Sequence, residues 1–175
     1  MSIVISALGE DRPGIVEALS QAILNNDCNI EDSRMSVMGG VFAVILLVSG
    51  QDTSLDALQQ ALPAIADKEQ LTLTTREAGE RSETGSYLPY QVQIVAMDHP
   101  GIVNRLSQFF AKRSINIHQL ETSSYSAAHT ATPMFAVHMK IEIPANQHLT
   151  ELRNAFYDLC DEYNLDGAIE AEGPK

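Results

Sequence analysis

The sequence predicts an α+β fold in which one β-α-β-β-α-β module occurs twice. The first observation is an internal repeat: residues 11–16 read DRPGIV and residues 98–103 read DHPGIV, an offset of 87 residues (11 to 98). The second is the pair Asn-Ile, which recurs at the same offset (29 to 116). The third is an amphipathic helical pattern after each loop, with strand-like segments around it.

The first strand and the first helix of each module flank the repeated loop. Residues 2–8 and 90–97 have β character, with a partial alternation of apolar side chains. After the loop, apolar residues recur at i, i+1, i+4, i+7 and i+8, the spacing of one helical face. These positions are Ile15, Val16, Leu19, Ala22 and Ile23 in the first half, and Ile102, Val103, Leu106, Phe109 and Phe110 in the second. We therefore expect the same buried helical face in both modules.

A β-hairpin comes next in each module. Gly39 and Gly40 separate the strand-like residues 30–38 and 41–49, and Gly-Gly in that position is a hairpin signal. The corresponding strands of the second half are expected at residues 115–125 and 134–143. Residues 126–133 replace the tight turn there with a longer, small and polar loop, which we expect to be mobile.

A second helix and a last strand complete each module. Residues 53–67 have the apolar spacing of a helix, although Pro63 could kink it or end it early. Residues 149–163 form the corresponding helix, and the last strands are expected at residues 70–76 and 168–171. This order gives a four-stranded antiparallel sheet with both helices on one face, the ferredoxin-like arrangement.

The predicted domains are residues 1–79 for module 1, residues 80–88 for a linker and residues 89–175 for module 2. The linker is rich in Gly, Ser and charged residues and has no apolar periodicity. A module of this kind leaves one sheet face and its edge strands exposed, and a second module or a second chain can cover them. We therefore expect a homo-oligomer.

The charge of the chain limits its partners. The formal net charge is −12, from 11 Lys and Arg against 23 Asp and Glu, and no cluster of Lys and Arg stands out in the sequence. Because nucleic-acid affinity rests on basic contacts, direct DNA binding is not expected. The start of the chain lacks a basic signal-peptide region, and the longest apolar run, residues 41–48, is too short to cross a bilayer. We expect a cytoplasmic protein whose Cys28 and Cys160 are reduced core thiols.

The two Asp-x-Pro-Gly loops are candidates for a ligand site. Proline presets the first helical turn, glycine permits a close approach to the main chain, and a helix N-terminus attracts a carboxylate. Asp11 and Asp98 could accept an ammonium group or could simply cap their helices. Asn29 and Asn116 begin the neighbouring strands and can both donate and accept hydrogen bonds. The residues alone fit an amino-acid site and an ordinary turn with a cap.

No catalytic constellation, metal site or cofactor motif is evident in the sequence. The five histidines are scattered, and none forms a metal-ligand motif with a cysteine or with another histidine. His118 and His138 lie on adjacent expected strands and could face each other, but we interpret them as strand residues rather than ligands. We expect no enzymatic activity and no cofactor.

Three segments of the first half carry a family resemblance. They are ALGEDRPGIV at residues 7–16, CNIEDSR at residues 28–34 and LLVSG at residues 46–50. The module order, the loop and the Asn-Ile pair resemble the ACT domain. The three segments, and the layout of two tandem ACT modules, resemble the glycine cleavage system transcriptional repressor family.

The resemblance implies a function and a site. It implies a repressor of glycine cleavage operon transcription that binds a DNA-bound LysR-type activator, with an amino acid, glycine above all, as its signal. ACT modules bind amino acids at interfaces between modules, through the first loop and the helix start. The corresponding residues here are Asp11, Arg12, Pro13, Gly14, Ile15 and Asn29 in module 1, and Asp98, His99, Pro100, Gly101, Ile102 and Asn116 in module 2.

One substitution between the loops, Arg12 to His99, separates the two candidate sites. Two other functions remain open. One is a free-standing ACT amino-acid sensor that regulates a metabolic enzyme, and the other is a structural adaptor that binds no amino acid.

Overall fold

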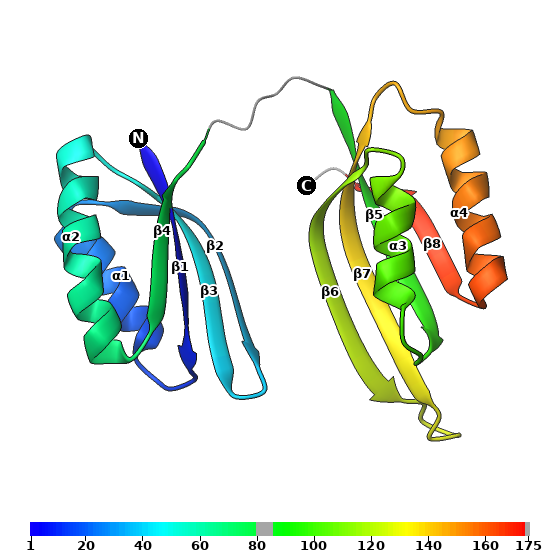
Figure 1. Ribbon diagram of the computed structural model, residues 1–175, viewed down its shortest axis with the longest axis horizontal. Helices are drawn as coiled ribbons and strands as arrows, with labels where there is room; N and C mark the ends of the chain where they lie inside the picture. Colours follow the sequence, from blue (N-terminus) through cyan, green and yellow to red (C-terminus); the bar gives the residue numbers. More distant parts are fainter. Residues whose placement is uncertain (80–85, 174–175) are drawn as a thin grey trace. The chain divides into compact units, whose positions relative to one another are not determined.

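The computed structural model describes residues 1–79 and 86–173. The chain divides into two compact units, Met1–Arg81 and Ser82–Lys175, and each has the order β-α-β-β-α-β. In each unit both helices cover one face of a four-stranded antiparallel sheet (Figure 1). The predicted α+β fold of two such modules is therefore confirmed. Of the linker predicted at residues 80–88, residues 80–85 lie outside the described residues.

Module 1 has the strand order β2-β3-β1-β4. Its elements are β1 (Ser2–Glu10), α1 (Ile15–Asn25), β2 (Asn29–Met38), β3 (Val41–Ser49), α2 (Asp52–Glu69) and β4 (Thr72–Glu77). The hairpin between β2 and β3 turns at Gly39 and Gly40, whose φ angles are 59° and 80°. A two-residue hairpin with both φ angles positive favours glycine, so the Gly-Gly signal was interpreted correctly.

Helix α2 continues through Pro63. Its apolar side chains Leu55, Leu58 and Leu62 are almost fully buried, whereas Pro63 is exposed. Packing of the apolar face holds the helix together, and the carbonyl group left without an N–H donor lies on the side that water can reach. The early end that Pro63 suggested does not occur.

Module 2 has the strand order β6-β7-β5-β8. Its elements are β5 (Tyr87–Met97), α3 (Ile102–Ala111), β6 (Asn116–Ser126), β7 (Pro133–Pro144), α4 (Leu149–Tyr163) and β8 (Asp166–Ala171). Strand β5 begins three residues before the expected residue 90, because Tyr87 and Leu88 pair with the end of β7. Leu88 also packs against the core. These two residues, assigned to the linker from the sequence, belong to the first strand.

Each module has its own hydrophobic core between its sheet and its helices. In module 2 three phenylalanine rings pack together, with ring centroids of Phe109 and Phe110 5.2 Å apart and those of Phe109 and Phe156 6.1 Å apart. Full burial of one such side chain stabilises the fold by about 1.5–3 kcal/mol. The helical face was predicted correctly except at the second position of each helix: Val16 is 54% exposed and Val103 is half-buried, because both lie at the margin of the apolar stripe.

Both cysteines are free and buried, as expected. Burial raises the pKa of Cys160 to about 11, and it also raises the pKa of Cys28. Both are therefore thiols rather than thiolates near neutral pH. Within residues 1–79 and 86–173, no helix is long and apolar enough to cross a membrane.

Candidate functional site

The two Asp-x-Pro-Gly loops have the same backbone conformation. Gly14 and Gly101 precede the helices with φ angles of 96° and 100°, a left-handed conformation that glycine adopts without strain. The N–H of Asp11 donates to the carbonyl of Gly40 (2.9 Å), and that of Asp98 donates to the carbonyl of Pro133 (2.9 Å). Each loop is thereby fixed to the hairpin of its own module. The sequence repeat is thus also a repeat of local structure.

Neither aspartate caps its helix. Gly14 and Gly101 occupy the N-cap positions, and no side chain accepts a hydrogen bond from the first turn of α1 or α3. Pro13 and Pro100 lie two residues before the first helical residue, so they constrain the loop that precedes the helix rather than the first turn of the helix itself. The cap interpretation is wrong, and the N–H groups of both first turns remain open to an external acceptor.

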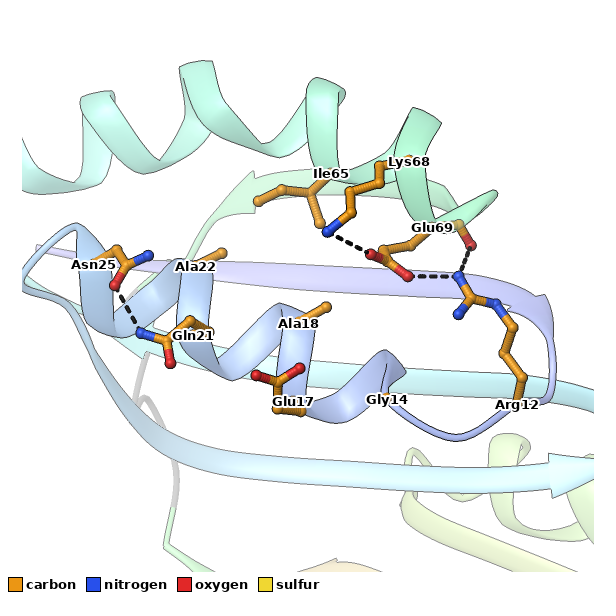
Figure 2. Close-up of a pocket in the computed structure, with 10 residues that line it drawn as sticks. All are labelled: Arg12, Gly14, Glu17, Ala18, Gln21, Ala22, Asn25, Ile65, Lys68 and Glu69. Atoms are coloured by element: carbon orange, nitrogen blue, oxygen red, sulfur yellow. Dashed lines mark hydrogen bonds and ion pairs between the residues drawn. The ribbon is translucent and has the colours of Figure 1, made fainter.

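Arg12 is held by the end of α2 (Figure 2). Its guanidinium donates to the carboxylate of Glu69 (2.5 Å) and to the carbonyl of the same residue (3.2 Å), and Lys68 lies 3.4 Å from that carboxylate. Glu69 is the one buried charged residue among those described. The hydrogen bond from Arg12 holds the pKa of Glu69 below its ordinary value.

Module 2 has no such pair at its loop. Nδ1 of His99 lies 3.2 Å from the carbonyl oxygen of Pro100, and the residue is half-buried. The hydroxyl of Ser124 donates to the carboxylate of Asp98 at 3.4 Å, a long hydrogen bond. The replacement of Arg12 by His99 therefore removes the connection between the loop and the last turn of the second helix.

Asn29 and Asn116 do not lie near the loops of their own modules. Asn29 is opposite Ser49 at the start of β2, whereas β1 ends with Glu10 opposite Val41 at the other end of β3. At about 3.3 Å per residue, the eight steps from Val41 to Ser49 span roughly 26 Å. Asn116 is likewise opposite Glu142, near the end of β7 that is remote from the loop. One module alone therefore does not bring together the predicted residues.

Both asparagines instead contact nearby glutamates. The Asn29 amide donates to Glu31 at 3.1 Å, and the Asn116 amide donates to Glu142 at 3.2 Å. Hydrogen bonds from Ser49 and from Asn29 lower the pKa of Glu31. Both asparagines are exposed, so they are accessible to a ligand or to another chain.

A groove of about 360 Å³ runs between α1 and α2, beside the module 1 loop (Figure 2). The loop contributes Arg12 and Gly14, and α2 contributes Lys68 and Glu69. The groove is further lined by Glu17, Ala18, Gln21, Ala22, Asn25 and Ile65. Sequence reasoning missed the α2 residues because they lie more than 50 residues beyond the loop. Gln21 and Asn25, which share a 2.7 Å hydrogen bond, could have been found as a polar i, i+4 pair.

The histidines form no metal site. Among the described residues, no group of three or more His, Cys, Asp or Glu side chains could hold an ion. His118 lies at an irregularity in the β6–β7 register, and His138 is opposite Glu121. The two histidines therefore do not form the facing pair that their positions in the sequence suggested.

Comparison with known proteins places this fold and these loops in a family. Residues 2–76 match the ACT domain family model. A crystal structure of an unknown protein from Galdieria sulphuraria superposes with a TM-score of 0.80 and 30% identity, over 98% of both chains. Residues 2–76 of the chain are therefore an ACT domain, and module 2 repeats the same fold.

Two further relatives carry the name of a particular repressor. The glycine cleavage system transcriptional repressor of Escherichia coli is 29% identical over 167 residues, which cover 95% of this chain and 88% of the relative. A crystal structure of a protein provisionally assigned as such a repressor is 25% identical, covers 99% of this chain and 98% of its own, and superposes with a TM-score of 0.72. This chain is a homologue of the glycine cleavage system transcriptional repressor.

Proposed function

We propose that this protein is a regulator rather than an enzyme, and that it represses a glycine cleavage operon by contacting a DNA-bound activator of the LysR type. The observation that carries the proposal is the match to the repressor over 95% of the chain, which spans both modules. The net charge of −12 supports action through a protein, because an acidic chain is repelled by the phosphates of DNA.

The open helix N-termini at Gly14 and Gly101 support an amino-acid signal, which we propose to be glycine. The carboxylate of the ligand accepts hydrogen bonds from the free N–H groups of the first helical turn, where the helix dipole also favours negative charge. Asp11 or Asp98, neither of which is used as a cap, then accepts the ammonium group. A ligand without a side chain suits a site formed by glycine and main-chain groups.

If Asn29 completes the site at the module 1 loop, it must come from a second copy of module 1, because the Asn29 of the same copy lies at the far end of the sheet. Strand β2 pairs with β3 alone among the described strands, and all ten of its residues are exposed. If two β2 edges pair in antiparallel fashion, the start of one strand faces the end of the other. Asn29 of one copy then lies at the loop end of its partner, and this supports a ligand site shared between two copies of the chain.

Isothermal titration of the full chain with glycine tests the ligand site, with serine and alanine as competitors and Asn29→Ala and Asn116→Ala as variants. We expect saturable binding selective for glycine. Loss of one or two hydrogen bonds to a charged ligand weakens affinity by about tenfold or more in the variant of the active module. Asn154→Ala, an exposed asparagine on α4, is the matched control and retains wild-type affinity. Absence of heat with all three amino acids contradicts the ligand site and favours the adaptor.

The partner is tested separately by electrophoretic mobility shift on the glycine cleavage promoter. We expect no shift with this protein alone and a supershift when the purified LysR-type activator is present. A shift by this protein alone contradicts action through protein contact. Absence of any supershift, together with glycine binding, favours the alternative in which the protein is a sensor for a metabolic enzyme.

A further inference from the structure

Module 2 has a cationic groove between α3 and α4. The groove has a volume of about 250 Å³ and is lined by Arg105, Gln108, Phe109, Lys112, Arg113, Leu159, Glu162 and Tyr163. Three cations thus face one carboxylate in a chain with a net charge of −12. No basic cluster of three residues stands out in the sequence, because Arg105 lies seven residues from Lys112 and comes near it only when α3 forms two helical turns.

The two arginines of this groove are held by aromatic rings. The guanidinium of Arg105 lies 3.8 Å from the centroid of the Tyr163 ring, and that of Arg113 lies 3.8 Å from the centroid of Phe109. Arg113 also donates to the carbonyl of Phe109 at 3.0 Å. Stacking restricts a guanidinium while leaving its N–H edge available, so less entropy is lost when an anion binds.

No carboxylate within the described residues neutralises these cations. None of the ion pairs found there involves Arg105, Lys112 or Arg113. The carboxylate of Glu162 instead accepts a hydrogen bond from Tyr163, and this bond is the main cause of the raised pKa of that phenol.

The corresponding groove of module 1 is balanced in charge. There Arg12 and Lys68 face Glu17 and Glu69, and both cations contact Glu69 (Figure 2). At the repeat offset of 87 residues, the three cations of module 2 replace neutral residues. Arg105, Lys112 and Arg113 stand at the positions of Ala18, Asn25 and Asn26. The positive charge is therefore particular to module 2 and is not required by the fold.

Helix stability accounts for only part of this charge. Lys112 and Arg113 lie at the end of α3, where a cation interacts favourably with the helix dipole. Arg105 is the fourth residue of the same helix, and a cation in the first turn is unfavourable for it. The helix dipole therefore does not explain the placement of Arg105, which stacks on Tyr163 and presents its N–H edge to the groove.

We propose that the groove between α3 and α4 binds a small molecule through an oxyanion group, a phosphate or a carboxylate. Arginine presents paired N–H donors that match both groups, and Lys112 adds a mobile ammonium. The volume lies below the roughly 300–1,000 Å³ of sites for drug-sized ligands, so it limits the ligand to a small metabolite. A long polyanion is not a suitable ligand, because proteins that bind DNA make about 6–10 phosphate contacts and three cations cannot provide them. The groove adjoins the module 2 loop, because a β-carbon at Gly101 would lie 3.7 Å from Nε of Arg105, but its cations come from α3 and not from the loop or from Asn116. The proposal does not depend on the proposed function.

Isothermal titration of the full chain at low ionic strength tests the groove, with inorganic pyrophosphate and succinate as probes. We expect saturable binding of one equivalent of at least one probe, and the preferred probe identifies the oxyanion. Arg105→Gln and Lys112→Gln each remove one charged contact, so each weakens binding by about tenfold. Circular dichroism establishes that the variants fold, and if one does not, the other carries the test.

The matched control is Arg153→Gln, which removes an exposed cation of α4 that does not line the groove. It retains wild-type affinity if the groove is the site. Two results overturn the proposal. One is that neither probe binds at about 10 mM, which would mean that any affinity is weaker than millimolar. The other is equal weakening by all three variants, which would indicate diffuse attraction to positive charge.

Discussion

Substitution of Gly167 by alanine tests how tightly the second core is packed. Gly167 lies on β8 opposite Ile94, and its backbone is not in the left-handed region. A β-carbon there would lie 2.6 Å from the Sγ of Cys160, 2.8 Å from the Cδ1 of Ile94 and 3.2 Å from the Cζ of Phe156. All three of these neighbours are buried, so none can turn toward solvent to make room.

Two opposing effects set the magnitude. Overpacking of a well-filled core destabilises a protein by about 1–3 kcal/mol. Replacement of glycine also reduces the entropy of the unfolded chain, which stabilises by about 0.4–1 kcal/mol. We therefore expect Gly167→Ala to lower the free energy of unfolding of module 2 by about 1–2 kcal/mol. For a domain of this size the melting temperature falls by roughly 4–16 °C.

Urea denaturation and calorimetry measure this change, and Gly173→Ala is the control because a β-carbon there meets nothing within 4 Å. Addition of Cys160→Ala removes the Sγ that the new methyl group meets. The cost of Gly167→Ala should then fall by about 1 kcal/mol, a coupling expected for residues in contact. Unchanged or increased stability in Gly167→Ala, or an equal cost in both backgrounds, would refute the steric argument.

Three further outcomes are expected. Glu69→Gln should be less stable than wild type at pH 7, with Glu17→Gln as the control. Because the pKa of Glu69 is lowered in the folded state, the stability that it contributes is present above its unfolded pKa of about 4.3 and is lost as pH falls through the folded value. The free energies of unfolding of Glu69→Gln and wild type, measured in urea, should therefore converge at low pH. Cys160, with a pKa of about 11, should be roughly one-thousandth thiolate at pH 8, so iodoacetamide should label it only after unfolding in urea, and rapid labelling of the native protein would contradict its burial. Val37→Lys places a charge on the free β2 edge and should shift sedimentation toward the monomer, whereas Leu24→Lys, an exposed apolar position on α1, should not.

Much of the fold could be predicted from the sequence because the repeat supplied the same evidence twice. Gly39 and Gly40 identified the hairpin through their backbone requirements, and the apolar spacing after each loop identified α1 and α3. The ends of elements were less predictable. Strand β5 extends back to Tyr87 because its first residues pair with β7, a contact made more than 50 residues away.

The candidate site was predictable in composition but not in arrangement. The sequence identified the loops and the asparagines. Asn29 follows the loop and α1 along the chain, yet the antiparallel register places it at the far end of the sheet from the loop. The pairing of Arg12 with Glu69 was also beyond sequence reasoning. It depends on where α2 ends, and no local pattern encodes the distance between that end and the loop.

The distance between the loop and Asn29 has a consequence for how such a regulator would respond in the cell. If each ligand contacts both, occupancy depends on the abundance of the protein as well as on that of the amino acid, because ligand binding and self-association then favour each other reciprocally. A cell that makes little of the protein would have a less sensitive response. Synthesis of more of it would lower the amino-acid concentration at which repression changes, without any mutation in the site.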